Sequence, residues 1–365
     1  MPTFLCRKFI VFYCRLKACF GILPLPGMNH AQLCSSLARL GNAFMEADNG
    51  NLALAKRRAS AENHWFDEKS VDFALSAWKE LLTEQNLQEW VQKGGLSAFV
   101  PEPKNIGIVM AGNVPLVGLH DLLCVLLSGH RARIKLSSDD SALMTFVIQE
   151  LSRYSPWLEE RLILVERLTD IDAIIATGSN NTSRYFEYYF RNIPHLLRKN
   201  RNSLAILTGS ETEEDLFEIG KDVFTYYGLG CRNITQLLLP EGSSPTPFYD
   251  AIADHFEVLN HNKYANNYTY HRALFLLNQQ KHLDNNFLLL KEDPTLYSPV
   301  GCLNYSYYKD EKDLEAYVRD HEEHIQVIVS KGSYSFHSVM PGQSQKPALD
   351  DYADGVNTLQ FCVNL

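Results

Sequence analysis

Among the eight cysteines of this 365-residue chain, Cys231 has the sequence context most typical of a reactive thiol. Gly228 and Gly230 precede it, and glycines allow the backbone to approach a ligand closely. Arg232 follows it, and a neighbouring cation favours the thiolate form that acts as a nucleophile. Cys124, in contrast, lies in an apolar run typical of an inert buried thiol. Cys231 is therefore our candidate nucleophile, and on this pattern alone a purely structural thiol stays the alternative.

The other cysteines show no pattern of a metal site or a disulfide framework. They are Cys6, Cys14, Cys19, Cys34, Cys302 and Cys362. No CxxC pair occurs, and the twelve histidines form no set of converging ligands, so the sequence predicts no metal. With 45% hydrophobic residues the chain can build a core without disulfides, and we expect a reducing, cytoplasmic location.

Three turns rich in small residues follow predicted strands, at 111–115, 135–138 and 176–179. They contain Gly112, Asn113, Lys135, Ser137, Ser138, Thr177, Gly178 and Ser179. Ligands of parallel α/β sheets bind beyond the carboxyl ends of the strands, where such turns lie. No GxGxxG fingerprint is present, and each turn taken alone could serve backbone geometry only. Three of them at successive strand ends favour a dinucleotide site.

The elements that must position these residues alternate between strand and helix from residue 105 onward. Residues 105–111 form a continuous apolar run, typical of a strand buried on both faces, and an apolar helix follows over 116–128. Helices are predicted before this region, at 31–47 and 70–92. Further strands are predicted at 133–136, 162–165, 173–176, 204–207, 235–239, 273–277, 325–329 and near 360–363. This pattern predicts an α/β protein with a doubly wound parallel-sheet cofactor domain and a second α/β catalytic domain.

In this order, the motifs resemble those of the LuxC-type acyl-CoA reductases, a divergent branch of the aldehyde dehydrogenase superfamily. The resemblance runs from about residue 63 to the C-terminus. It rests on the segments 105–121, 132–138, 176–190, 226–233 and 341–358. It implies an aldehyde dehydrogenase-like fold, a fatty acyl thioester substrate carried by CoA or by a protein, and catalysis through an S-acyl intermediate on Cys231.

The resemblance also implies roles for the turn residues. Asn113 would bind the oxyanion together with the backbone N–H of Cys231. Lys135 would contact the adenosine ribose, and Gly112, Ser137, Thr177, Gly178 and Ser179 would line the dinucleotide. Ser138 stands where many NAD-specific relatives carry a glutamate, so NADPH is the expected cofactor and NADH an acceptable one. The nearby Asp139 weakens this preference.

Two further segments carry implied roles and departures from the superfamily pattern. Residues 295–300 look like the segment under the nicotinamide ribose, with Thr295 in place of a glutamate and Tyr297 beside it. Residues 205–209 look like the segment whose glutamate activates the hydrolytic water in aldehyde-oxidising relatives, and Thr208 within them is an expected cofactor-binding residue. No acid is present there, so hydrolysis would lack its general base. Reduction of a thioester is favoured, while aldehyde or semialdehyde oxidation and a non-catalytic dinucleotide-binding scaffold stay open.

The net charge and the division of the chain into parts give further predictions. The net charge of −9 makes a nucleic-acid partner unexpected. Residues 1–27 are basic and apolar, but Arg15 and Lys17 interrupt the apolar runs, which predicts an extension rather than a membrane span. We expect three further parts. They are a helical N-terminal region with the dinucleotide-binding domain (28–208), a catalytic domain (209–338), and a tail (339–365) that makes contacts in a homo-oligomer.

Overall fold

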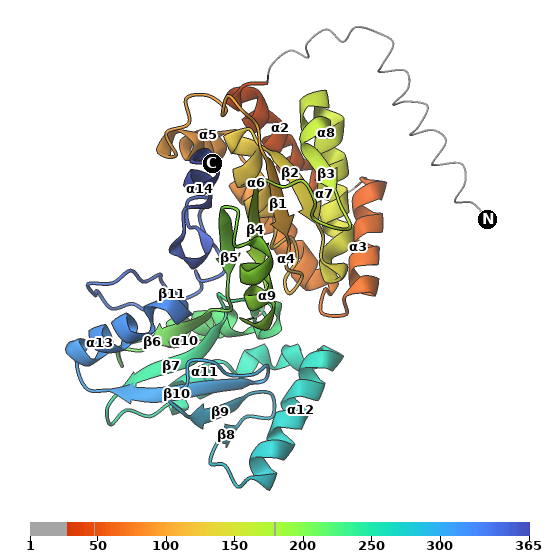
Figure 1. Ribbon diagram of the computed structural model, residues 1–365. Coiled ribbons are helices and arrows are strands. Elements are labelled where there is room, and N and C mark those ends of the chain that lie inside the picture. The colour runs from red at the N-terminus through yellow and green to blue at the C-terminus, as the bar shows by residue number, and fades with distance from the viewer. Residues whose placement is uncertain (1–27, 47, 179) are drawn as a thin grey trace, which may run out of the picture.

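Two α/β lobes, each built on its own sheet, make up the computed structural model (Figure 1). The structure describes residues 28–46, 48–178 and 180–365. Our expectation that residues 1–27 form an extension therefore concerns residues outside the described part of the chain.

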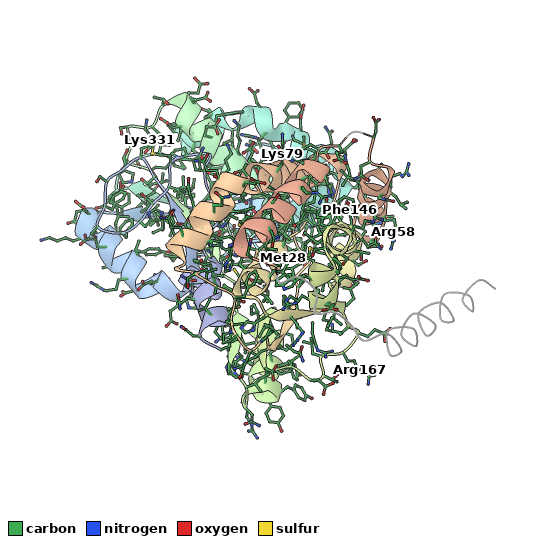
Figure 2. All side chains as sticks on the ribbon, turned by 90° about the horizontal axis from the view of Figure 1, so that it is seen from above. Met28, Arg58, Lys79, Phe146, Arg167 and Lys331 are labelled. Carbon is green, nitrogen blue, oxygen red and sulfur yellow. The ribbon has the colours of Figure 1, made fainter. Side chains whose placement is uncertain are left out.

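Four helices precede the first sheet. They are α2 (His30–Ala43), α3 (Gly50–Glu62), α4 (Glu68–Leu81) and α5 (Glu84–Lys93). The helix predicted over 70–92 is thus two helices, because the hydroxyl of Thr83 accepts from the N–H of Asn86 and begins a new one. Side chains fill the space inside this lobe, with Phe146 among those at its core (Figure 2).

The first sheet is entirely parallel and has the strand order β3-β2-β1-β4-β5. Its strands are β1 (Asn105–Val109), β2 (Arg131–Lys135), β3 (Leu162–Leu164), β4 (Ala173–Thr177) and β5 (His195–Arg198). Its helices are α6 (Leu119–Ser128), α7 (Ser141–Tyr154), α8 (Pro156–Arg161) and α9 (Asn180–Phe190). The chain runs from β1 outward to β3 and then returns to β4 on the other side of β1. The predicted doubly wound sheet is confirmed, and its switch point lies between β1 and β4.

The second sheet has the order β11-β6-β7-β10-β9-β8, and the β8–β9 pair is its antiparallel part. Its strands are β6 (Asn202–Ile206), β7 (Ile234–Pro240), β8 (Leu283–Asp284), β9 (Leu289–Glu292), β10 (Cys302–Tyr308) and β11 (Ile325–Val329). The helices of this lobe are α10 (Glu213–Phe224), α11 (Thr246–Ala251), α12 (Asn262–Leu277) and α13 (Glu311–His321).

Three predicted strands differ from the structure. Residues 204–207 were expected in the first lobe, but β6 pairs with β7 and β11, so the second lobe begins before our boundary at 208. Residues 273–277 are the last turn and a half of α12, and residues 360–363 belong to the helix α14 (Thr358–Val363). Short apolar runs do not distinguish a strand from a helix, which explains the last two errors.

The C-terminal tail lies against both lobes of its own chain. In the first lobe, the indole N–H of Trp90 donates to the hydroxyl of Tyr352 at 2.8 Å, and α14 packs against α6. In the second, Asp351 forms an ion pair with Arg232 at 2.8 Å. The tail therefore connects the two lobes of one chain. Its expected contacts in a homo-oligomer stay a prediction.

Candidate functional site

Cys231 lies just before the amino end of β7, in a loop held by the buried side chain of Asn233. The amide nitrogen of Asn233 donates to the carbonyls of Asp222, Val223 and Thr225, at 3.1, 3.2 and 2.7 Å. Its amide oxygen accepts from the N–H of Gly230 at 2.8 Å. A single side chain thus joins the end of α10 to the loop. The sequence analysis assigned no role to Asn233. Its position directly before an apolar strand could have indicated a buried polar side chain that holds the loop.

The backbone before the thiol is unusual. Tyr226, Tyr227 and Gly228 are successive left-handed residues, with φ of 52°, 58° and 79°. Glycine adopts this conformation freely, but for each tyrosine it costs on the order of 1–3 kcal/mol. Such a conformation persists only where surrounding contacts impose it, so the loop is shaped by its neighbours rather than by its own preference.

Cys231 is an exposed residue, whereas the other cysteines in the described part of the chain are buried. Protein atoms nevertheless crowd around the sulfur, and this desolvation raises its pKa above the ordinary value of 9.0. The charge of Arg232 lowers the pKa and that of Asp354 raises it. Arg232 therefore acts in the expected direction, but desolvation outweighs it and the thiol form is favoured in the free protein.

Asn113 lies close to this loop, as the sequence led us to expect. Its side-chain amide donates to the carbonyl of Leu229, two residues before the cysteine, at 2.9 Å. Val114 lies against the same loop, since a β-carbon added to Gly230 would be 3.6 Å from its Cγ1. An asparagine amide has two hydrogens, so one is left for a ligand while the other holds the loop.

The turn that carries Asn113 is fixed at both ends. A β-carbon at Gly112 would lie only 2.5 Å from Oγ of Ser137, so this close approach requires glycine. At the other end, Leu116 has a φ of 59°, and its N–H donates to the buried carboxyl of Asp140 at 2.7 Å. Burial raises the pKa of Asp140 well above its usual value.

The remaining predicted dinucleotide residues gather at the carboxyl edge of the first sheet. Lys135 ends β2 and is exposed, and Ser138 follows it in an exposed turn. Thr177 ends β4 on the other side of the switch point, with Gly178 directly after it. Ser179 lies outside the described residues. The residues fit a dinucleotide, because an exposed cation and small residues border the switch point where such ligands bind.

Thr295 and Tyr297 lie in a loop that the second sheet holds near the amino end of β7. The amide of Asn304 donates to the carbonyls of Thr295 and Tyr297, at 2.8 and 2.9 Å. The hydroxyl of Thr235 donates to the carbonyl of Leu296 at 2.7 Å. Because Thr235 is four residues after Cys231, the loop lies at the same edge of the sheet as the thiol. Tyr297 is 61% exposed there.

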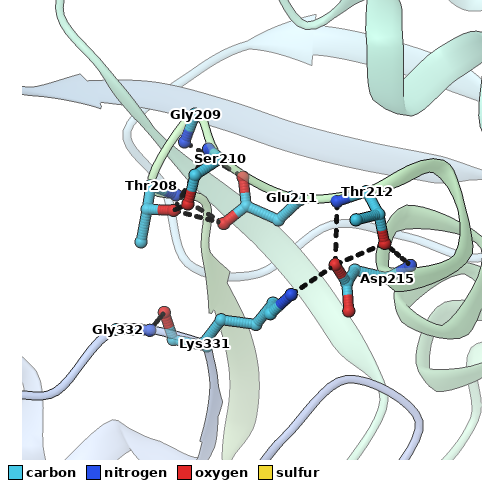
Figure 3. Close-up of polar contacts among 9 residues, drawn as sticks. Thr208, Gly209, Ser210, Glu211, Thr212, Asp215, Lys331 and Gly332 are labelled. Atoms are coloured by element: carbon cyan, nitrogen blue, oxygen red, sulfur yellow. Dashed lines mark hydrogen bonds and ion pairs between the residues drawn. The ribbon is translucent and has the colours of Figure 1, made fainter.

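Thr208 is not brought to this site. It follows the carboxyl end of β6, while the hydroxyl of Ser203, near the amino end, donates to the carbonyl of Cys231 at 2.8 Å. Thr208 instead donates through its N–H and its hydroxyl to Glu211, at 2.7 and 2.8 Å (Figure 3). Since β6 and β7 are parallel, Thr208 and Cys231 lie at opposite edges of the sheet. Residues 205–209 thus do not occupy the place expected for a water-activating segment.

The described part of the chain holds neither a metal-ligand cluster nor a membrane-spanning helix. No group of three or more histidine, cysteine or acidic side chains there could hold a metal ion. Across the same residues, no helix has both the length and the apolar run that crossing a bilayer requires.

Comparison with known proteins identifies the family of the chain. The family model described as acyl-CoA reductase (LuxC) matches residues 51–259, more than half of the chain. No curated protein matches the sequence.

Solved structures with a similar fold are aldehyde dehydrogenases and related enzymes at low identity. Aldehyde dehydrogenase 21 from Physcomitrella patens, in complex with succinate, is 11% identical, with 93% of this chain and 84% of that chain covered and a TM-score of 0.65. An aldehyde dehydrogenase from Mycobacterium tuberculosis complexed with NAD+ is 16% identical, with coverages of 86% and 75% and a TM-score of 0.59. The NADP-dependent glyceraldehyde-3-phosphate dehydrogenase from Bacillus halodurans, complexed with NADP, is 15% identical, with coverages of 82% and 73% and a TM-score of 0.59. The fold is thus that of the aldehyde dehydrogenases, and the chain belongs to the LuxC family of acyl-CoA reductases, oxidoreductases that act on acyl or aldehyde groups.

Proposed function

We propose that this protein reduces a fatty acyl thioester to the aldehyde with NAD(P)H, through an S-acyl intermediate on Cys231. The observation that carries the proposal is the hydrogen bond from Asn113 to Leu229. It joins the carboxyl edge of the first sheet to the loop of the exposed residue Cys231.

In the acylation step, the sulfur of Cys231 attacks the carbonyl carbon of the thioester. The new S–C bond forms, the bond to the departing thiol breaks, and the proton of Cys231 goes to that thiol. The oxyanion formed on the way accepts from the second amide hydrogen of Asn113 and from the backbone N–H of Cys231. A preorganised donor of this kind is worth about 3–4 kcal/mol.

The dinucleotide would be held by Lys135 and Ser138 on one side of the switch point and by Thr177 and Gly178 on the other. When bound there, NAD(P)H would supply a hydride to the S-acyl carbon, and cleavage of the S–C bond would then release the aldehyde and restore the thiol of Cys231. Ser138 carries no charge that would repel a 2′-phosphate, and Lys135 attracts one, which favours NADPH over NADH.

Reduction is favoured over aldehyde oxidation by the family match, because the model that covers residues 51–259 describes acyl-CoA reductases. Near the thiol, the carboxylate of Asp351 is held by Arg232 at 2.8 Å, so this side chain is engaged in an ion pair and would not be free to position a hydrolytic water.

The test is the intact mass of the protein after incubation with a long-chain acyl-CoA and no dinucleotide. We expect one acyl adduct on the wild-type protein and none on C231A, while both bind NADPH equally. C34A is the matched control, because it removes a buried thiol and should still form the adduct. An adduct on C231A would contradict the assignment, and faster oxidation of aldehyde with NAD than reduction of acyl-CoA with NADPH would contradict the direction.

A further inference from the structure

The connector between α3 and α4, residues 63–67, contacts both halves of the candidate site. At its start, the buried side chain of Asn63 donates to the carbonyl of Gly112 at 3.2 Å, directly beside Asn113. The amide oxygen of Asn63 accepts from the N–H of Trp65 at 3.0 Å. The first half of the connector is therefore fixed to the turn that carries the oxyanion donor.

At its end, the connector reaches the loop that carries the nucleophile. The hydroxyl of Tyr227, four residues before Cys231, donates to Oδ2 of Asp67 at 2.5 Å. The other carboxylate oxygen of Asp67 accepts from the N–H of Ser70 at 2.9 Å and caps α4. Burial opposes ionisation of Asp67, but these hydrogen bonds outweigh it and lower its pKa, so Asp67 is a charged acceptor.

Aromatic contacts hold the same two segments together. The ring of Trp65 stacks on His261 with centroids 4.9 Å apart, and His261 lies 4.2 Å from the ring of Tyr227. Phe73 of α4 meets Tyr226 edge to face at 5.5 Å. Both tyrosines with a left-handed backbone are thus held by the connector and the helix that follows it.

We propose that the connector 63–67 sets the separation between Asn113 and Cys231, with Asp67 and Tyr227 as positioning residues for the acylation step. This inference rests on the proposed function. Without the Asp67–Tyr227 hydrogen bond, Tyr227 loses the charged partner that anchors its hydroxyl, and the loop can relax away from the Asn113 turn. A displacement of about 1 Å is enough to slow a reaction on the order of 100-fold.

The experiment measures the single-turnover rate at which acyl-CoA acylates Cys231. We expect Y227F, which loses only the hydroxyl, to acylate at least about 10-fold more slowly at saturating acyl-CoA, with an unchanged KM. D67S should show the same loss, because serine still caps α4 but is too short to reach Tyr227. The double variant should lose no more than either single variant, since one interaction is removed.

Y249F is the matched control. Its hydroxyl also donates to a protein oxygen, the carbonyl of Leu288 at 3.0 Å, in a part of the second lobe away from the connector. We expect Y249F to acylate at the wild-type rate with a thermal midpoint similar to that of Y227F. Equal acylation rates in the wild type and Y227F would overturn the positioning role alone, whereas a wild-type protein that forms no adduct would overturn the proposed function.

Discussion

The side-chain amide of Asn113 donates to the carbonyl of Leu229 over 2.9 Å. This bond joins the turn after β1 to the loop of Cys231, although the two segments are more than a hundred residues apart in the sequence. It leaves one amide hydrogen of Asn113 available to a substrate oxygen.

Replacing Asn113 should therefore slow the chemistry without removing the thiol. We expect N113A to lower kcat for acyl-CoA reduction by about 100- to 1000-fold, because an oxyanion donor is lost. Steady-state kinetics with NADPH measure this. N105A is the control, since Asn105 lies at the opposite end of β1 and is only half-buried, and it should keep wild-type kcat. Equal losses in both variants would mean that the effect of N113A is structural.

Opposite charges act on Cys231, so two variants should move its pKa in opposite directions. D354N removes a negative charge and should lower the pKa, while R232Q removes a positive charge and should raise it. The rate of alkylation by iodoacetamide as a function of pH measures both shifts. In the wild type, the midpoint should lie above that of an ordinary cysteine, because desolvation raises the pKa. Shifts of the same sign in both variants would contradict this account.

The fold was largely predictable from the sequence, and the reason is periodicity. The run at 105–111 has the unbroken apolar character of a strand buried on both faces, and β1 occupies it. The run at 273–277 is equally apolar, but it continues a helix that begins at Asn262 with only Tyr264 and Tyr268 buried. Its mixed surface gave no helical pattern to detect, so local composition alone favoured a strand.

Only the site residues that lie within recognisable sequence motifs could be predicted. Cys231 and Asn113 stand in recognisable segments, and the structure joins those segments. Asp67 shapes the loop through a contact with a segment that the sequence does not place nearby. Asn233 acts within its own segment, but its buried hydrogen bonds to Asp222 and Val223 depend on how that segment folds back. Thr208 shows the converse, since a short local likeness placed it at the site and the direction of β6 places it at the opposite edge.

Cofactor choice should depend on Ser138. We expect S138E to weaken NADPH binding by about 10-fold or more relative to NADH, because a carboxylate repels the 2′-phosphate and can accept from a 2′-hydroxyl. Titration of each dinucleotide, followed by fluorescence, measures the ratio of the two dissociation constants. S138Q has a similar size without charge and is the control, so an equal change in both variants would point to bulk rather than charge.

Asp222 should make stability rise as the pH falls from 7 to about 4. It is buried and accepts from the N–H of Gly342 and from the N–H and hydroxyl of Ser344, at 2.8, 3.1 and 2.7 Å. Burial outweighs these bonds and raises its pKa from 3.8 to about 6. Between those values the folded state binds more protons than the unfolded state, so acidification stabilises the fold through this group, by at most about 3 kcal/mol.

The measurement is urea unfolding of the wild type and D222N at several pH values. The free energy of unfolding of the wild type minus that of D222N should rise as the pH falls from 7 to 4. D215N is the control with the opposite sign: ion pairing with Lys331 lowers the pKa of Asp215 to about 2, so its contribution is present above pH 3.8 and is lost only below it. Between pH 7 and 4 the difference from D215N should therefore stay nearly constant. A constant difference for D222N as well would show that Asp222 titrates normally and that its hydrogen bonds to the tail fully compensate for its burial.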